Sequence, residues 1–475
     1  MTAPYTLPRI DGLTDDEQAL ATAMVRNWRD NLAKNSERAK HYGGHVDVSK
    51  LDLGVSVPPP IVRKLRRQSV MWSAKAVDAL ADCSTFDGFA FTGDAPDGFA
   101  EIMDDIDLVS KYVSAVPSEL VHCSVLWTVT PGDPDDGEPA AVVNCYDMLH
   151  STYLWDYRRG RILCALVVTD VDPKNRRKPT AVNYYGAKDT VECRLTEKGW
   201  KSTRHANGLG RCAAEPMRYK PDLSHPMGRS RITRSIMQLE DNANREAVHM
   251  VMHNELYTSP TRWVMGAPDD IFEGGRWQAY LGSIFALPRD ENGDAPSTGS
   301  YPAGDVEPFV RAMRQWANML ASEACIPVHS LLYTEANPAS SEAIIAAEND
   351  LVKRAQDMNR ENGRALRNVG LMVLSLLTET PFGELPADAR TMKARWKNPA
   401  HPSLSAQADS MTKLASVEPS LPKSRVFWES NGFDEPTVDR ILADVKRADA
   451  ATAIAASLSA ATSKSDEVGD NGANS

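Results

Sequence analysis

The longest periodic stretch of the sequence is SSEAIIAAENDLVKRAQDMNRENGRALRNVGLMVLSL, residues 340–376. Apolar residues recur along it at the spacings of one face of an α-helix. They are Ile344, Leu351, Ala355, Met358, Leu366, Val369, Val373 and Leu376. The pattern predicts a helix of about 37 residues, roughly 55 Å long. A helix with one apolar face along such a length needs neighbours to cover it.

Two further helices are predicted immediately before this segment. The first opens at Gly228 and ends before Pro260, with apolar residues at Ile232, Ile236, Leu239, Ala243, Ala247, Met250 and Leu256. The second starts at Asp305 and stops at Pro327, with Phe309, Met313, Trp316 and Leu320 on one face. A turn-rich insertion, residues 261–304, separates them, and a polar loop, 328–339, leads to the longest helix. We expect both helices to have apolar stripes without a partner in one subunit, so that a ring of copies supplies one.

The middle of the chain has a different period. Short β-branched or aromatic runs at 125–129, 141–146, 162–169, 181–185 and 191–195 are separated by turn clusters such as Pro131-Gly132-Asp133-Pro134. This pattern predicts an antiparallel β region of about 90 residues that ends near Pro216.

Helices are predicted on both sides of these segments. Thr14 and Glu17 form a capping-box pattern at the start of an N-terminal helix, and another helix runs from about Ala100 to Val121. Near the C-terminus, a helical piece is predicted over 435–451. Residues 452–475 are rich in Ala, Ser and Asp without aromatics, and we expect them to be disordered.

Composition excludes several classes of protein. The net charge of -11 is opposite to that of a conventional DNA-binding domain. No apolar run approaches the ~20 residues that span a bilayer, and the N-terminal residues show no basic-then-apolar signal pattern, so we expect a cytoplasmic setting without a membrane. The seven cysteines are scattered without a C-x-x-C pair, which indicates free thiols rather than disulfides or a zinc site.

Motifs for catalysis or cofactor binding are absent from the sequence. No phosphate-binding loop and no nucleophile elbow occurs, so neither a packaging ATPase nor a serine hydrolase is indicated. His249 and His253 have metal-ligand spacing but lack the glutamate of a zinc protease. The acidic runs 104–107 and 133–136 are more typical of solvated surface than of a metal site. We predict no enzyme, no metal and no cofactor.

Several loose motifs resemble those of tailed-bacteriophage portal proteins, in particular the group typified by siphophages of Gram-positive hosts. Four groups of residues carry the resemblance: Pro216–Tyr219 with Pro226–Ser230, Leu239–Asn244 with Ser259–Arg262, Pro338–Ala343 with Glu348 and Lys353, and Leu421–Ser424 with Asn431–Glu435. Two positions depart from the family pattern, because no Asn follows Tyr219 and Ser341 stands where Gly is common. The resemblance covers roughly residues 15 to 445.

The resemblance implies an α+β portal-type subunit with an α/β wing, a two-helix stem, a small α/β clip, a long helix behind a tunnel loop, and a helical crown. By analogy the regions are the wing at 1–228 with a return at 377–400, stem helices at 229–257 and 305–326, the clip at 258–304, the tunnel loop at 327–340, the long helix at 341–376, and the crown at 401–451, followed by the tail at 452–475.

The implied function is a dodecameric head–tail connector at one capsid vertex of the virion, assembled in the host cytoplasm. Double-stranded DNA would pass through it during packaging and genome ejection. The ring would dock the large terminase and then a head–tail adaptor, and with capsid and scaffold proteins it would nucleate capsid assembly. Two rivals remain: another virion structural protein, such as a minor head protein, and a DNA-processing nuclease.

Two sets of site residues follow from this assignment. The polar tunnel loop is expected to face DNA through Tyr333, Thr334, Glu335 and Asn337. The stem helices are expected to contact neighbouring subunits through Ile236, Leu239, Met250, Phe309, Met313 and Trp316. An acidic ring suits a conduit, since tight phosphate binding would hinder sliding of the duplex.

Overall fold

The computed structural model describes residues 5–45, 70–93, 95–133, 135, 137–257, 262–265, 297–300, 304–331, 341–400, 404–433 and 435–469. Its helices are α1 (Asp15–Tyr42), α3 (Trp72–Asp82), α4 (Phe99–Ile106), α5 (Leu108–His122), α6 (Arg234–Tyr257), α7 (Glu307–Ala324), α8 (Ser341–Leu377), α9 (Leu404–Val417), α10 (Arg425–Ser430) and α11 (Glu435–Gly469). Short 3-10 turns lie at η4 (Val328–Ser330), η5 (Phe382–Glu384), η6 (Ala389–Thr391) and η7 (Leu421–Lys423).

Twelve strands of the described residues form four antiparallel sheets. The largest has the order β4-β5-β6-β7-β8, the second β3-β2-β9, and two pairs are β1-β12 and β10-β11. Their bounds are β1 (Phe86–Ala90), β2 (Ser124–Pro131), β3 (Ala141–Asp147), β4 (Ser151–Asp156), β5 (Arg161–Asp172), β6 (Asn175–Tyr185), β7 (Asp189–Thr196), β8 (Gly199–Ala206), β9 (Ala214–Arg218), β10 (Arg262–Met265), β11 (Ser297–Ser300) and β12 (Lys393–Trp396). The predicted antiparallel β region is confirmed.

The two larger sheets with α1, α3, α4, α5 and the C-terminal half of α8 form what we call the body. Alternate residues of β5 belong to two different hydrophobic clusters. Leu166 and Val168 pack with Met24, Val25 and Trp28 of α1, whereas Ala165 and Val167 belong to the main core with α5, the second sheet and α8. The largest sheet is therefore covered on one face by α1 and on the other by the rest of the body.

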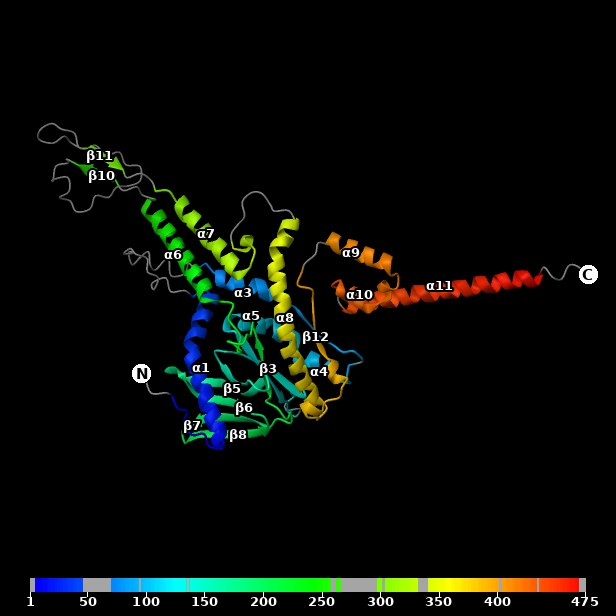
Figure 1. Cartoon of the computed structure of the whole chain (residues 1–475), viewed down its shortest axis with the longest axis horizontal. Helices are drawn as coiled ribbons and strands as arrows, with labels where there is room; N and C mark the ends of the chain where they lie inside the picture. Colours follow the sequence, from blue (N-terminus) through cyan, green and yellow to red (C-terminus); the bar gives the residue numbers. More distant parts are fainter. Residues whose placement is uncertain are drawn as a thin grey trace, which may run out of the picture.

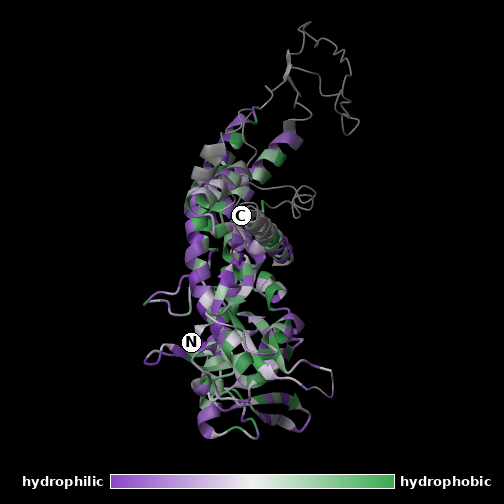
Figure 2. Cartoon of the chain, turned by 90° about the vertical axis from the view of Figure 1, so that its right-hand side faces the viewer, coloured by the Kyte–Doolittle hydropathy of each residue, from purple (hydrophilic) through white to green (hydrophobic). Residues whose placement is uncertain are grey.

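Figure 1 shows the helix pair α6–α7 leaving the body side by side, with the antiparallel strand pair β10–β11 at its far end. Helix α8 runs along the body, and α9, α10 and α11 lie on the opposite side from the helix pair. Figure 2 shows hydrophobic residues gathered inside the body and hydrophilic ones along its projecting hairpins. No helix of the described residues is long and apolar enough to cross a membrane.

Several boundaries differ from the sequence expectation. The single helix predicted over 100–121 is two helices, because Asp107 adopts a left-handed conformation (φ 50°) and caps α5 by accepting from the amide of Ser110. The helix expected over 229–257 begins at Arg234, since the amides of Arg229 and Arg231 instead bond Tyr219 O and Leu120 O. The helix expected over 305–326 spans 307–324.

The expected disorder of residues 452–475 is wrong for much of the segment. Helix α11 continues through it to Gly469. Alanine, the strongest helix former, recurs through residues 448–461 and explains the continuation. The helix has little packing to hold it, because residues 446–455 are all exposed.

Residues 377–400 return to the body. Strand β12 pairs antiparallel with β1, about 300 residues earlier in the chain, through contacts such as Phe86 with Trp396. Their rings lie 5.6 Å apart, and Tyr112 of α5 lies 5.3 Å from Trp396. This aromatic group holds the segment after α8 against the start of the body.

Candidate channel-lining interface

The helix pair α6–α7 is joined by small residues. Ala317, Ala321 and Ala324 of α7 are buried, as are Ile236 and Ala243 of α6, and all five belong to the main core. Alanine lets two helix backbones approach closely. The pair is therefore one structural unit whose base is fixed in the body.

The six residues predicted to contact neighbouring subunits fall into two groups. Ile236 and Leu239 are 2% and 8% exposed and are covered by their own chain. Met313 and Trp316 pack, half-buried, against the same core. Met250 and Phe309 are half-buried farther from the body, where the Phe309 ring lies 5.4 Å from the ring of His253. The expectation that the stripes lack a partner within one subunit is thus wrong for Ile236 and Leu239. Contact of the four half-buried residues with a neighbouring subunit stays a prediction.

A second face of α7 is open to solvent. Its exposed residues recur every three or four positions: Arg311, Arg314, Gln315, Asn318, Met319 and Ser322. This face is polar apart from Met319, which is 44% exposed. It carries Arg311 and Arg314, and the exposed acids Glu307 and Glu323 lie at its two ends. A helix face of this kind can meet a hydrated, charged polymer without a large desolvation cost.

Arg231 anchors the base of the helix pair. Its side chain is 4% exposed and lies just before α6. The guanidinium donates to Ala76 O of α3, to Ala324 O at the end of α7 (2.9 Å) and to the Tyr219 hydroxyl (3.4 Å). One side chain therefore joins both helices of the pair to α3 and to the segment after β9.

Glu240 forms a second anchor, within α6 itself. It is fully buried, and its Oε2 accepts from the Ser73 hydroxyl of α3 and lies 3.2 Å from His41 Nδ1 of α1. One turn later, Asn244 Oδ1 accepts from the amide of Val70 (2.8 Å). Burial lowers the pKa of His41, but the hydrogen bond and charge of Glu240, with Asp241 and Glu37, outweigh it and raise the pKa overall.

The predicted tunnel-loop residues Tyr333, Thr334, Glu335 and Asn337 lie outside the described residues. The segments that flank them are described. Before them, the η4 turn is held to α3 by Lys75 Nζ, which donates to Ser330 O (3.0 Å). After them, α8 starts at Ser341. Both ends of this segment are thus attached to regular structure.

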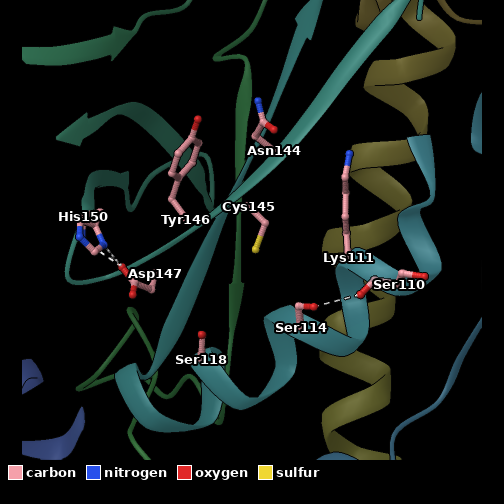
Figure 3. A pocket seen from close by; sticks show the side chains of 9 residues that line it. All are labelled: Ser110, Lys111, Ser114, Ser118, Asn144, Cys145, Tyr146, Asp147 and His150. Carbon is pink, nitrogen blue, oxygen red and sulfur yellow. Dashed lines mark hydrogen bonds and ion pairs between the residues drawn. The ribbon is translucent and has the colours of Figure 1, made fainter. Parts of the chain in front are cut away.

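A surface pocket of about 560 Å³ lies between α5 and β3. Figure 3 shows its lining, which includes Cys145, Asp147 and His150, residue types that could form a nucleophilic site. His150 Nδ1 bonds Asp147 at 2.7 Å, but no hydrogen bond joins it to the thiol. Burial raises the pKa of Cys145 to about 12, so the thiol stays protonated at neutral pH. The lining does not supply an activated nucleophile.

The described part of the chain shows no metal site and no disulfide. It contains no group of three or more His, Cys, Asp or Glu side chains placed to hold an ion. His249 lies 3.9 Å from Glu246, on the same helix. All seven cysteines are free, with Cys164, Cys193 and Cys212 buried.

The anchoring residues were not identified from the sequence. Glu240 lies four residues after Ile236, on the apolar face of the predicted helix, and a charge in that position is a signal for a buried polar contact. Arg231 carries no comparable signal, because its acceptors are backbone carbonyls about 155 and 93 residues away.

Comparison with known proteins identifies the family. Residues 33–426 match the family described as "Phage portal protein, SPP1 Gp6-like". The chain is 26% identical to the portal protein of Mycobacterium phage L5 and 28% identical to that of Mycobacterium phage D29. Each alignment spans 434 residues, 87% of this chain and 85% of the relative. With this match over most of its length, and with an α+β fold that agrees with it, the chain belongs to the SPP1 Gp6-like family of phage portal proteins.

Proposed function

We propose that twelve copies of this chain form a ring at one capsid vertex, and that DNA passes through its centre during packaging and ejection. The observation that supports this most strongly is the family match over residues 33–426. In this proposal the body is the wing, the helix pair α6–α7 is the stem, and β10–β11 belong to the clip. The segment before α8 is the tunnel loop, and α9–α11 form the crown.

The open polar face of α7 is the stem surface that we assign to the channel. The opposite face of α7 packs in the main core with α6, whereas this face is exposed. Twelve chains at -11 give the ring a charge of -132. This charge repels the duplex from the wall, while Arg311 and Arg314 allow transient phosphate contacts.

Added charge on this face tests the assignment. Replacing Gln315 and Asn318 with lysine adds 24 positive charges around the channel of a dodecamer. Since each new phosphate contact steepens the salt dependence of DNA binding, we expect packaging to slow and to become strongly salt-dependent while rings still form. The measurement is the DNA packaging rate at several ionic strengths.

The matched control places two lysines at Thr203 and Ala206, exposed residues of β8 at the far side of the body (Figure 1). Rings with this change should package at the wild-type rate. If both variants slow packaging equally, the effect comes from total charge, and α7 does not line the channel. Wild-type packaging by the α7 variant at every ionic strength also contradicts the assignment.

The same proposal names the partners. The ring would dock the large terminase during packaging and a head–tail adaptor afterwards, and it would act with capsid and scaffold proteins in capsid assembly. We place its assembly in the host cytoplasm and its final position in the virion. It would act as a structural protein without catalysis, whereas a nuclease would need a metal or nucleophile site.

A further inference from the structure

A polar cluster inside the body joins α5 to the long helix α8. Glu119 of α5 and Asn362 of α8 are both 0% exposed. Asn362 Nδ2 donates to Glu119 Oε2 at 2.8 Å and to the Tyr112 hydroxyl at 3.2 Å. Ser84 links the Tyr112 hydroxyl (2.7 Å) to Asn359, one turn earlier on α8. Two residues of α8 are thus bonded to the body through one buried network.

Two oxygens of this network lack a partner. They are Glu119 Oε1 and Asn362 Oδ1. They belong to the same carboxyl and amide groups whose other atoms, Oε2 and Nδ2, are already bonded to each other. Both are acceptors if Glu119 is ionised, and neither can then satisfy the other. No arginine, lysine or histidine bonds Glu119 in the described structure, so an ionised carboxylate would be buried there with one hydrogen bond. Such burial is strongly unfavourable.

We propose that Glu119 is a proton-binding site, held as a neutral carboxylic acid that donates from Oε1 to Asn362 Oδ1. A single proton, taken up from water, then satisfies both remaining oxygens. The acid and the amide form a reciprocal pair, with the amide N–H bonded to the acid carbonyl and the acid O–H bonded to the amide carbonyl. This pair fastens α8 to α5.

The groups around Glu119 are compatible with a neutral carboxylic acid at this position. Burial raises the pKa of Glu119 to about 8, although the Asn362 hydrogen bond lowers it. Of the nearby titratable groups, Tyr112 and Cys123 have a pKa raised by burial, and burial lowers that of His122 to about 4. All three are neutral at neutral pH. The facing groups from α8 and from the α3–β1 connection are the amides of Asn359 and Asn362 and the hydroxyl of Ser84.

The proton makes the attachment of α8 sensitive to pH. Because the pKa in the folded chain lies above the unfolded value of 4.5, the unfolded chain loses the proton first as pH rises. The stability that the proton confers is therefore complete below about pH 4.5 and decreases up to about pH 8.

Infrared difference spectroscopy on the assembled full-length protein tests the proposal. We expect wild type minus Glu119→Gln to show the carbonyl band of a protonated carboxylic acid at pH 6, which disappears as pH is raised through about 8. Glutamine can keep the reciprocal pair, because its amide donates where the acid hydroxyl did, so the variant should fold. Asn359→Ala, which removes an amide that does not bond Glu119, should retain the band.

A second measurement follows unfolding across pH. Between about pH 4.5 and 8, this group alone raises the unfolding equilibrium constant of the wild type by up to tenfold per pH unit. Glu119→Gln should lack that contribution. A carboxylate band already present at pH 6, or identical pH profiles for the two proteins, would overturn the proposal.

Discussion

Replacement of Arg231 with methionine is expected to loosen the helix pair α6–α7 from the body. Methionine fills much of the arginine volume but has no donor, so Ala324 O at the end of α7 loses its partner in a buried site, whereas Ala76 O, inside α3, keeps only its helical bond. A buried acceptor left unsatisfied costs about 1–3 kcal/mol, and the lost hydrogen bond from a charged donor to Ala76 O costs about 1.5–3 kcal/mol. We therefore expect the free energy of unfolding to fall by roughly 2–5 kcal/mol. Thermal or denaturant unfolding of the purified protein measures it.

Arg231→Lys is a second variant that tests the same contacts. Lysine keeps the charge but lacks the planar fork that reaches three acceptors on different elements. Arg231→Lys should therefore lose most of the stability that Arg231→Met loses. Arg229→Met is the matched control, since the Arg229 side chain is exposed and pairs with Asp222 at the surface (2.6 Å). Full stability of Arg231→Met would mean that the buried guanidinium does not hold the base of the helix pair.

Replacement of His41 with leucine is expected to have a comparable effect at the second anchor, Glu240 of α6. It removes the cation beside Glu240 and leaves a fully buried carboxylate with the Ser73 hydroxyl. Removal of one partner of a buried ion pair typically costs about 3–5 kcal/mol. The double variant His41→Leu, Glu240→Leu should recover part of this loss, because apolar replacement of both partners leaves no charge to compensate.

The stability lost in His41→Leu should depend on pH in a defined direction. The pKa of His41 in the folded protein is raised above its usual 6.5. The ion pair therefore contributes its full stability below about pH 6.5, and the contribution disappears as pH rises through the folded-state pKa. Denaturant unfolding of wild type and His41→Leu at several pH values should give a difference that shrinks with increasing pH. A constant difference would show that His41 acts only by packing.

Local patterns in the sequence predicted much of the fold. The capping box at Thr14 and Glu17 forms as expected, with both hydrogen bonds present. The periodic stretch at 340–376 matches α8 to within one residue at each end. Both features depend on contacts between residues close in sequence, where side-chain type and spacing decide the structure.

Features that depend on distant partners were not predictable in this way. The pairing of β1 with β12 joins two short segments, and neither carries a pattern that specifies the other. The buried network of Glu119 and Asn362 joins residues 243 positions apart. The mutual burial of α6 and α7 was also missed, because an apolar stripe shows that a partner exists but not whether it is the same chain.

The mass of the purified protein in solution tests the central claim most directly. Light scattering under reducing, metal-free conditions should give a value near twelve times 52.1 kDa, and negative-stain images of the same sample should show rings with a central hole. A stable 52.1 kDa monomer at high protein concentration, without rings in the images, would contradict the assignment of this chain as the subunit of a DNA conduit.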